Sequence, residues 1–527
     1  MTGNSLSKFR VCHIAATADG ATWMVEQLRQ LRDQKGYDVS AIIGTGSGAL
    51  ADKLHNEGIP FQRFDFEFPS SSWGTLIRRV AQLSAILRRE RYDIVQTHLF
   101  ASMVLGRLAS WIADVPVRLA MVAGPYHLEA HTPRWIDSST FWMETGLIAS
   151  CEYTRSLYLE MGAPPERVAL IYYGPDEAKF DRRRSSAIDL RRDLSLPKSS
   201  KLVGMVAYFY PRLPVSSWTP EILHDRANKR QEDLINAAPA ILAEFPQARI
   251  VFIGSGWGEA GESEMAHARS LVAALSLEEA VLFTGYRDDV NSILMSLDVA
   301  VQASLSENLG GTIESLLMQC PTVATRTGGL VDSVRDGETG VLVEPLNPSD
   351  LAQGVLRILR DPVRAQELGA NGRALMLDRF TLKRTITDLD ELYREQIGRQ
   401  GAGYGTVISS FRTTLAVPIF LYLAAHLAWD IKIAPTLKVF MGRATSGLGR
   451  ASSRLTTLLS GAPSLDTSLA ESQPDSHEIS QEKLSKRFAD RGYLQCLYAY
   501  GYCRYLLRNT TLLQKWDRFF GWIRGRT

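Results

Sequence analysis

The sequence predicts an α/β protein whose two halves each combine parallel strands with helices. Short apolar runs of strand length alternate with amphipathic helices and Gly-rich turns, an order typical of parallel sheets. One such set starts at residues 11–15 and a second at residues 202–207. A chain of 527 residues, 45% hydrophobic and 22% charged, is long enough to bury two cores. We therefore expect two Rossmann-like domains that face each other across a cleft.

Composition narrows the classes of partner. A formal net charge of +2 is too small to indicate nucleic acid. The cysteines are scattered without the paired spacing of metal ligands, which favours reduced thiols. The first residues lack the apolar run of a secretory signal, so we expect a cytoplasmic protein. The cysteines are Cys12, Cys151, Cys320, Cys496 and Cys503.

Residues 44–49, Gly-Thr-Gly-Ser-Gly-Ala, match the dinucleotide-binding fingerprint, with Asp65 about twenty positions further on. That fingerprint normally opens the first βαβ unit, whereas here it follows the second strand. Asp65 also follows an Arg-containing strand at 61–64, a poor setting for a ribose pocket. We therefore do not expect a dinucleotide cofactor.

Residues 75–91 predict a helix with one apolar face and arginines along its edges. Two interpretations stay open for these arginines. They form an ordinary solvated face, or they contact anionic lipid headgroups or a lipid diphosphate acceptor. The arginines are Arg78, Arg79, Arg88, Arg89 and Arg91.

The most informative stretch follows the predicted strand at 299–303. A Ser-Glu-Asn turn leads into Gly310-Gly311 and then into a helix that begins near Thr312. Backbone N–H groups at a helix start attract anions. Glu307 and Glu314 flank this turn, and carboxylates accept hydrogen bonds from hydroxyls. The combination suits a ligand with both phosphate and sugar parts, such as a nucleotide sugar.

This stretch resembles the donor-site signature of the family-4 retaining glycosyltransferases, which have the GT-B fold. The resembled signature has two glutamates with seven residues between them, then a Pro-Val-Val-Ala-Thr strand and a Gly-Gly turn. Its counterparts here are Glu307, Glu314, residues 321–325 and Gly328-Gly329. Only six residues separate the two glutamates. Outside this resemblance, a capped helix with Gly-rich turns in any α/β domain would account for the pattern.

The resemblance implies a set of donor-binding residues. Glu314 would bind the ribose, a glycine after the first strand would approach the diphosphate, and a lysine with one arginine would neutralise it. Lys229 matches the lysine, while Arg212, Arg226 and Arg230 are alternatives for the arginine. The candidates are Gly20, Arg212, Lys229, Arg230, Gly254, Gly285, Asn308, Gly310, Gly311 and Glu314.

The resemblance also implies three catalytic candidates. Glu307 would lie near the reacting sugar. His98 ends the strand at 93–98, where relatives carry histidines, and His127 is the histidine nearest to the relatives' His-Gly position. For both histidines a structural role is the alternative. No Asp-x-Asp motif ends a strand, so we expect no metal and no cofactor besides the donor substrate.

The elements also predict domain boundaries. An acceptor-side domain covers 1–180, a linker 181–200, the donor domain 201–380 and a crossover helix 381–400. Beyond these the chain departs from the resembled family, and the expected segments are an apolar helical part at 401–459, a disordered linker at 460–485 and a basic-aromatic tail at 486–527.

The last quarter of the chain suggests contact with a membrane. Residues 413–429 are uncharged, but their number is at the lower limit for a spanning helix. An interfacial helix or docking onto the catalytic part are alternatives. Basic and aromatic residues mix in 486–527, as at membrane interfaces. We expect membrane contact through 411–431 and 486–527.

Together these features favour a metal-independent, retaining, hexosyl-type glycosyltransferase. It would move a sugar from a nucleotide sugar to a glycan or lipid-linked acceptor in bacterial-type surface polysaccharide or glycolipid synthesis. The expected location is the cytoplasmic face of the inner membrane. The alternatives are a nucleotide-sugar epimerase and a non-catalytic, membrane-tethered subunit of glycan assembly.

Overall fold

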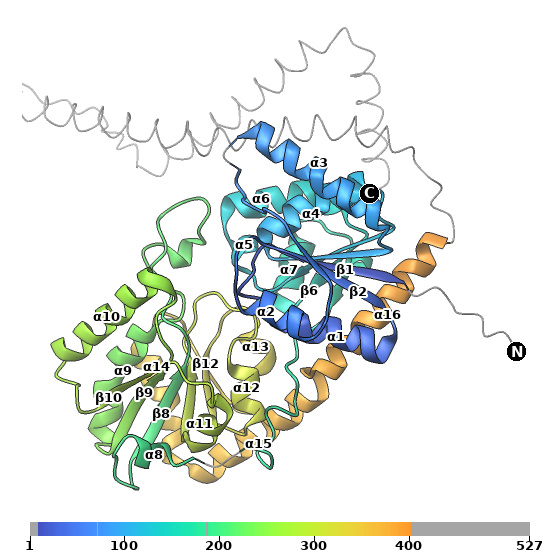
Figure 1. Cartoon of the computed structure of the whole chain (residues 1–527). Coiled ribbons are helices and arrows are strands. Elements are labelled where there is room, and N and C mark those ends of the chain that lie inside the picture. The colour runs from blue at the N-terminus through green and yellow to red at the C-terminus, as the bar shows by residue number, and fades with distance from the viewer. Residues whose placement is uncertain (1–8, 71, 186–187, 402–527) are drawn as a thin grey trace, which may run out of the picture. The chain divides into compact units, whose positions relative to one another are not determined.

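The computed structural model describes residues 9–70, 72–185 and 188–401, and within them it contains two parallel sheets (Figure 1). The first sheet has seven strands in the order β3-β2-β1-β4-β5-β6-β7. The second has six strands in the order β10-β9-β8-β11-β12-β13. The prediction of two Rossmann-like parts is therefore confirmed.

The first half alternates strands with helices along the chain. Its strands are β1 (Arg10–Ala15), β2 (Asp38–Ile43), β3 (Phe61–Arg63), β4 (Ile94–His98), β5 (Val117–Val122), β6 (Gly146–Ala149) and β7 (Val168–Leu170). Its helices are α1 (Trp23–Lys35), α2 (Ala49–Asn56), α3 (Trp73–Glu90), α4 (Phe100–Ile112), α5 (Tyr126–Glu129), α6 (His131–Thr140) and α7 (Glu152–Glu160), with 3-10 turns at Phe141–Met143 and Pro165–Arg167.

The second half repeats this alternation. Its strands are β8 (Lys201–Val206), β9 (Ala248–Ile253), β10 (Val281–Gly285), β11 (Val299–Gln302), β12 (Thr322–Thr325) and β13 (Val341–Val343). Its helices are α8 (Leu190–Asp193), α9 (Gln231–Glu244), α10 (Gly258–Ala274), α11 (Val290–Ser296), α12 (Thr312–Leu317), α13 (Leu330–Ser333), α14 (Pro348–Arg360) and α15 (Pro362–Arg379), with a 3-10 turn at Glu221–Leu223. The last described helix is α16 (Leu382–Gly401).

Strand order fixes where a ligand can approach each sheet. The central strands β4 and β11 are buried along their whole length because helices cover both faces of each sheet. β11 is mostly apolar, whereas β4 also carries the polar residues Gln96, Thr97 and His98. In each sheet the order reverses beside the first strand, between β1 and β4 and between β8 and β11. Loops at the carboxyl ends of these strands diverge there, and ligands of open parallel sheets bind at that edge.

The Gly44–Ala49 motif has a structural role. Gly44 N–H donates to Thr17 O at 3.0 Å, and Ala49 N–H donates to Asp19 Oδ1 at 2.9 Å. A Cβ on Gly48 would lie 2.6 Å from the Asp19 backbone, and its φ of 154° also disfavours a side chain. The glycines thus let the loop after β2 pack against the loop after β1.

One arginine of the basic helix α3 neither lies on a solvated face nor is available to contact lipid. Arg79 is buried and forms ion pairs with Asp65 and Glu67, so it belongs to the interior. Asp65, which a dinucleotide-binding site would place at the ribose, takes part in this ion pair instead. The other four arginines are exposed. Arg88 donates to Ile112 O and Arg89 pairs with Glu90, and contact of these arginines with lipid stays a prediction.

The segment predicted as a linker at 181–200 packs against the second half. It contains α8, whose Leu190 is fully buried in the core formed with β8, β9 and α11. Arg191 donates to Ser296 O at 3.0 Å and pairs with Asp298. This stretch is therefore held to the second sheet along much of its length.

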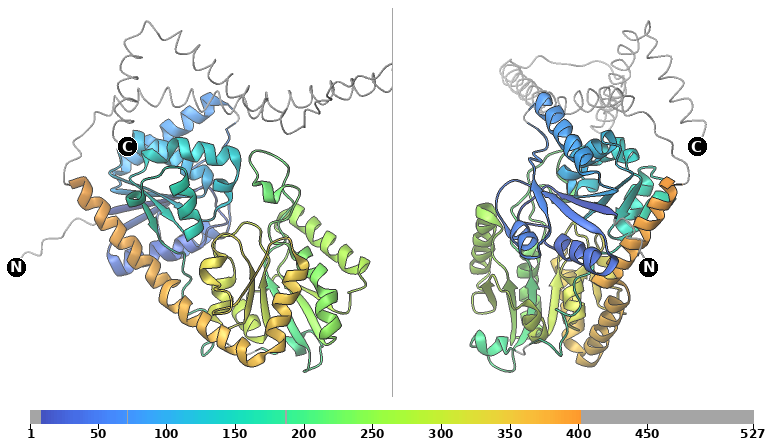
Figure 2. Two further views of the ribbon diagram at one scale, coloured as in Figure 1. Left: turned by 180° about the vertical axis from the view of Figure 1, so that it is seen from behind. Right: turned by 45° about the vertical axis from the view of Figure 1, so that its right-hand side comes forward.

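Helix α16 leaves the second half and packs on the first (Figure 2). Leu382, Ile386, Leu389 and Tyr393 are buried with side chains of β1, β4 and α1. At its start, Leu382 N–H donates to Pro175 O at 2.9 Å. One helix thus ties the end of the second half to the core of the first.

The expectations for 401–459, 460–485 and 486–527, including membrane contact through 411–431, fall almost wholly outside the described residues and stay predictions. Within the part that the structure describes, no helix is long and apolar enough to span a membrane. Cys12, Cys151 and Cys320, the cysteines of the described part, are buried and free.

Gly174→Ala tests the docking of α16. A Cβ at residue 174 would lie 2.1 Å from the Thr381 carbonyl carbon, so the chain must shift where α16 begins. We expect a loss of about 2 kcal/mol in the free energy of unfolding, measured by urea denaturation. Gly398→Ala is the control, because nothing lies within 4 Å of its Cβ position and alanine favours a helix. Equal urea midpoints for the two variants would contradict this account.

Candidate active site

The turn between β11 and α12 brings the central candidates together at the carboxyl edge of the second sheet. The Ser304 hydroxyl donates to Glu307 Oε2 at 3.0 Å, and Lys229 Nζ forms an ion pair with the same oxygen. The side chains of Lys229 and Glu307 are each 15% exposed. Two residues that the sequence nominated separately therefore form one nearly buried contact.

Asn228 holds Lys229 in this position. Its Nδ2 donates to Ser306 O at 2.8 Å, and Ser306 N–H donates to its Oδ1 at 2.9 Å. Leu305 N–H also donates to Asn228 O at 3.0 Å. These three bonds join the segment before α9 to the segment after β11, so Lys229 and Glu307 are held at fixed backbone positions.

Burial and charge shift the two ionisable groups beside Glu307. Burial lowers the pKa of Lys229, but the Glu307 carboxylate outweighs burial and raises that pKa above its ordinary value. Burial raises the pKa of Glu314 on α12, and Lys229 opposes this only in part. The site thus holds a firmly charged ammonium between two carboxyl groups.

The start of helix α12, where backbone N–H groups were predicted to attract an anion, offers only a weak attraction. Helix α12 has only six residues, so its dipole is small, and Gly311 at its N-cap supplies no side-chain hydrogen bond. Gly310 has a φ of 51°, in the left-handed region. Asn308 is buried, and its Oδ1 has no hydrogen-bond partner among the described residues. A diphosphate here would therefore depend mainly on the charge of Lys229.

The arginine candidates are occupied by other groups. Arg230 caps α9 with a φ of 55° and pairs with Asp233 and Glu232, which are carboxylates of its own helix. Arg212 pairs with Glu232 and with Glu264 on α10. The structure thus joins Lys229 to Glu307, while the carboxylates of α9 and α10 hold Arg212 and Arg230.

His98 lies in the interior of the first half. It is fully buried, and its Nε2 is 3.2 Å from His13 Nδ1 and 3.3 Å from Gln96 Nε2. Tyr393 of α16 donates to Gln96 Oε1 at 2.6 Å. Burial, and then His13, lower the pKa of His98 well below its ordinary value, so it is neutral at pH 7. This is the hydrogen-bonded structural setting, and a catalytic role for His98 stays a prediction.

His127 lies on the short helix α5 beside a buried charge cluster. Its Nε2 is 3.8 Å from Asp137 Oδ2, and its ring lies against Phe100 with centroids 5.2 Å apart. Arg107 donates to Asp137 Oδ1 at 2.6 Å. His127 is 7% exposed, so the structure gives it a positioned but nearly covered ring.

Gly20 lies in the loop between β1 and α1, and its N–H donates to Thr17 Oγ1 at 3.1 Å. Approach of this loop to a donor diphosphate stays a prediction.

Sequence reasoning missed an aromatic cluster at the same edge. Tyr208 follows β8, Trp257 follows β9 and Tyr286 follows β10, so three neighbouring strands each lead to an aromatic ring. The rings of Tyr208 and Trp257 are 5.1 Å apart, and those of Tyr208 and Tyr286 lie 6.4 Å apart at 23°. Trp257 is 44% exposed and Tyr286 64% exposed. The sequence feature that could have revealed this cluster is an aromatic residue after each of the three strands.

Gly254 and Gly285 connect two of the loops that carry these aromatic rings. They follow β9 and end β10, and Gly254 N–H donates to Gly285 O at 2.9 Å. The bond joins the two loops that carry Trp257 and Tyr286.

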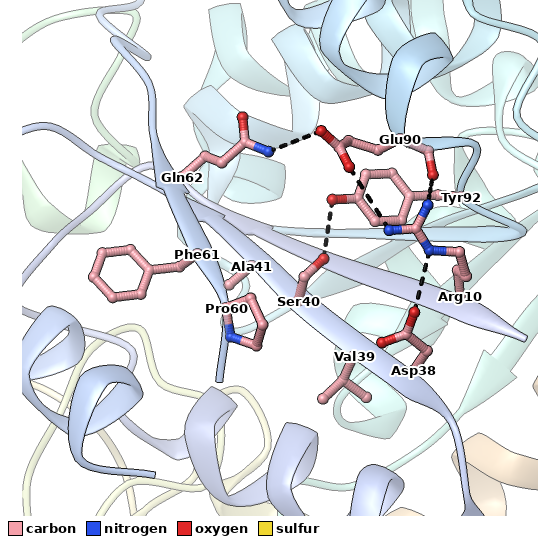
Figure 3. Close-up of a pocket in the computed structure, with 10 residues that line it drawn as sticks. All are labelled: Arg10, Asp38, Val39, Ser40, Ala41, Pro60, Phe61, Gln62, Glu90 and Tyr92. Atoms are coloured by element: carbon pink, nitrogen blue, oxygen red, sulfur yellow. Dashed lines mark hydrogen bonds and ion pairs between the residues drawn. The ribbon is translucent and has the colours of Figure 1, made fainter. Parts of the chain in front are cut away.

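The first sheet has a hollow at the amino ends of its strands, and this hollow is not a second candidate for a small-molecule site (Figure 3). It lies at the amino ends of β1, β2 and β3 and has a volume of about 140 Å³, below the ~300–1,000 Å³ of typical small-molecule sites. Arg10 there already pairs with Asp38 at 3.2 Å and with Glu90 at 3.7 Å. The charged side chains that line the hollow are therefore paired with one another.

Two family models match the chain. Residues 19–174 match the model described as "Glycosyl transferase 4-like domain". Residues 222–361 match the model described as "Glycosyl transferases group 1". Together they cover more than half of the chain and include the Lys229–Glu307 contact.

Relatives and solved structures agree with these matches. The chain is 29% identical over 339 residues to a D-inositol 3-phosphate glycosyltransferase of Acidothermus cellulolyticus, covering 60% of this chain and 71% of that protein. A glycosyltransferase of Rickettsia africae shares the fold with a TM-score of 0.62 and 18% identity, covering 74% and 99% of the two chains. The Anabaena protein HepE, solved in complex with UDP, shares it with a TM-score of 0.59 and 20% identity, covering 73% and 100%.

Glu314→Gln should change how stability depends on pH in the absence of ligand. The folded protein holds the Glu314 proton to a higher pH than the unfolded chain does. The stabilisation from this group is therefore complete below the unfolded pKa and is lost as pH rises through the folded pKa. Relative to the wild type, the free energy of unfolding of the variant should increase as the pH rises above about 4, the ordinary pKa of a glutamate.

Urea denaturation at a series of pH values measures this difference. Glu279→Gln, at an exposed position, is the control and should follow the wild-type curve. A difference between Glu314→Gln and wild type that stays constant across the range would contradict the burial assigned to Glu314.

Proposed function

Because this chain belongs to the family-4 glycosyltransferases of the GT-B fold, we propose that it transfers a hexosyl group from a nucleotide sugar with retention of configuration. The observation that carries the proposal is the Lys229–Glu307 contact at the carboxyl end of β11, with Glu314 beside it. A cation and two carboxyl groups at a sheet's ligand-binding edge suit a ligand with a diphosphate and sugar hydroxyls.

The donor would extend along this edge. The exposed rings of Trp257 and Tyr286 offer faces on which a nucleobase can stack. Lys229 would meet the diphosphate, Glu314 the ribose hydroxyls and Glu307 the transferred sugar. HepE, which shares the fold, was solved with UDP and with UDP-glucose, and this supports a uridine nucleotide as the first donor to test.

Charge explains how this arrangement would assist the reaction. As the bond between the sugar C1 and the diphosphate oxygen breaks, negative charge grows on the leaving diphosphate. A fixed ammonium in a nearly buried site stabilises that charge well. In the ligand-free protein Lys229 pairs with Glu307, so donor binding would move part of this interaction to the phosphate and free Glu307 for sugar hydroxyls.

Retention requires that the acceptor oxygen attack C1 on the face that the diphosphate leaves. The acceptor O–H proton then passes to the departing diphosphate oxygen, so one C–O bond forms, one breaks and no external base is consumed. We propose this course without a metal, with Lys229 as the group that neutralises the leaving diphosphate.

We further propose a glycan or lipid-linked acceptor in surface polysaccharide or glycolipid synthesis, at the cytoplasmic face of a membrane. The support for this part is the sequence of 411–431 and 486–527, outside the described residues. The names of two relatives, a D-inositol 3-phosphate glycosyltransferase and an N-acetyl-glucosaminyl L-malate synthase, also make small polar acceptors worth including in a screen.

Thermal unfolding with a panel of nucleotide sugars tests the donor proposal. The true donor should raise the melting temperature of the wild type by mass action, and Lys229→Ala should lose most of that rise. Losing one charge-assisted contact weakens binding by roughly 10- to 100-fold. Each variant is compared with its own ligand-free melting temperature, because Lys229→Ala also leaves Glu307 unpaired.

Lys198→Ala, an exposed lysine of the same half, is the matched control and should keep the full shift. An unchanged shift in Lys229→Ala would remove Lys229 from the donor site. Incubation of the wild type with the donor alone then separates the alternatives. An isomeric nucleotide sugar would indicate an epimerase, and binding without transfer or hydrolysis would indicate a non-catalytic subunit.

A further inference from the structure

The short helix α5 of the first half touches the donor loop of the second half. Ser306, which is buried, donates its hydroxyl hydrogen to Glu129 Oε2 at the end of α5. Ser306 immediately precedes Glu307, and Asn228 binds its backbone on both sides. The Glu129 carboxylate thus reaches, from the acceptor-side half, the residue next to the glutamate assigned to the donor sugar.

The partners of Glu129 are unusual for a partly buried carboxylate. In the part of the chain that the structure describes, it forms no ion pair with lysine or arginine. Its hydrogen-bond partners are the hydroxyls of Ser306 and Tyr153, and His127 is the charged or titratable side chain that acts on it electrostatically. Burial raises its pKa, and these three groups lower it less.

Buried carboxylates are ordinarily paired with a cation, because desolvation of an unpaired charge is costly. A purely structural contact with a serine would not need a carboxylate. A carboxylate surrounded by hydroxyl donors is, by contrast, the chemistry that binds and orients a sugar or polyol hydroxyl. The Ser306 hydroxyl occupies the position that such a ligand hydroxyl would take.

We propose that Glu129 binds the attacking hydroxyl of a polyhydroxylated acceptor, which replaces the Ser306 hydroxyl as its hydrogen-bond donor. This inference rests on the proposed transferase function and deepens it. Glu129 accepts a hydrogen bond from the acceptor O–H and directs a lone pair of that oxygen at the sugar C1. As the bond between C1 and the diphosphate oxygen breaks and the new C1–O bond forms, the acceptor O–H turns from Glu129 to the departing diphosphate oxygen, which takes the proton. One C–O bond forms, one breaks, and Glu129 ends the reaction unchanged.

Another explanation is that Glu129 acts only as a latch that holds the donor loop through Ser306. The two explanations differ in Ser306→Ala. If Glu129 is a latch, Ser306→Ala and Glu129→Gln remove the same contact and should have the same effect. If Glu129 binds the attacking oxygen, Ser306→Ala leaves that function in place.

Water can serve as the acceptor probe, because it occupies the same position when the donor is hydrolysed. Release of UDP from UDP-glucose and from UDP-N-acetylglucosamine is measured for wild type, Glu129→Gln, Glu129→Asp, Ser306→Ala and the exposed control Glu160→Gln. Melting temperatures with and without UDP report folding and nucleotide binding separately from turnover.

We expect Glu129→Gln to lower kcat by about tenfold or more with little change in KM for the UDP-sugar or in the UDP shift. Glu129→Asp should recover part of the rate, and Ser306→Ala should stay within about threefold of wild type. Equal losses in Glu129→Gln and Ser306→Ala would overturn the proposal in favour of the latch. A wild type that binds UDP but neither hydrolyses any nucleotide sugar of the panel nor transfers its sugar to any acceptor of the screen would instead refute the transferase function, and this inference with it.

Discussion

The ion pair between Lys229 and Glu307 is the contact on which the account of this protein depends. It joins the segment before α9 to the segment after β11 at the point where the strand order of the second sheet reverses. Because Asn228 fixes the backbone on both sides, the two charges are held in place before any ligand arrives. Such preorganisation is what allows a fixed charge to act on a leaving group without a cost of rearrangement.

Two side-chain contacts connect the halves of the protein, and one of them comes from this same turn. Ser306 reaches Glu129 of α5, and Asp332 of α13 accepts a hydrogen bond from the Glu152 N–H at the start of α7, at 2.7 Å. Helix α16 adds a covalent route by carrying the chain back to the first core. The turn at the end of β11 is therefore linked to the first half by side-chain contacts as well as by the chain.

Much of the fold could be predicted from the sequence because its signals are local. A strand buried on both faces of a parallel sheet is rich in apolar residues, and β1 and β11 are. Glu307 and Glu314 could be nominated because they lie in a short motif after β11, and Lys229 because of the resemblance to the family. The structure describes their surroundings, and their roles in donor binding stay proposals.

The remainder depended on contacts that no local pattern encodes. Arg230 looked available beside Lys229, but its left-handed cap position turns it toward Asp233. Arg79 lies on the arginine-lined edge of its helix in the sequence pattern, but its side chain is buried and pairs with the exposed carboxylate of Asp65. Glu129 attracted no notice because its partner Ser306 lies 177 positions away. Pairings of this kind are set by tertiary packing.

A crystal structure of the protein with UDP tests the central claim most directly. We predict phosphate oxygens within about 3 Å of Lys229 Nζ and the ribose hydroxyls on Glu314, with the Lys229–Glu307 contact lengthened or shared. UDP bound elsewhere, with Lys229 still paired only to Glu307, would contradict the account.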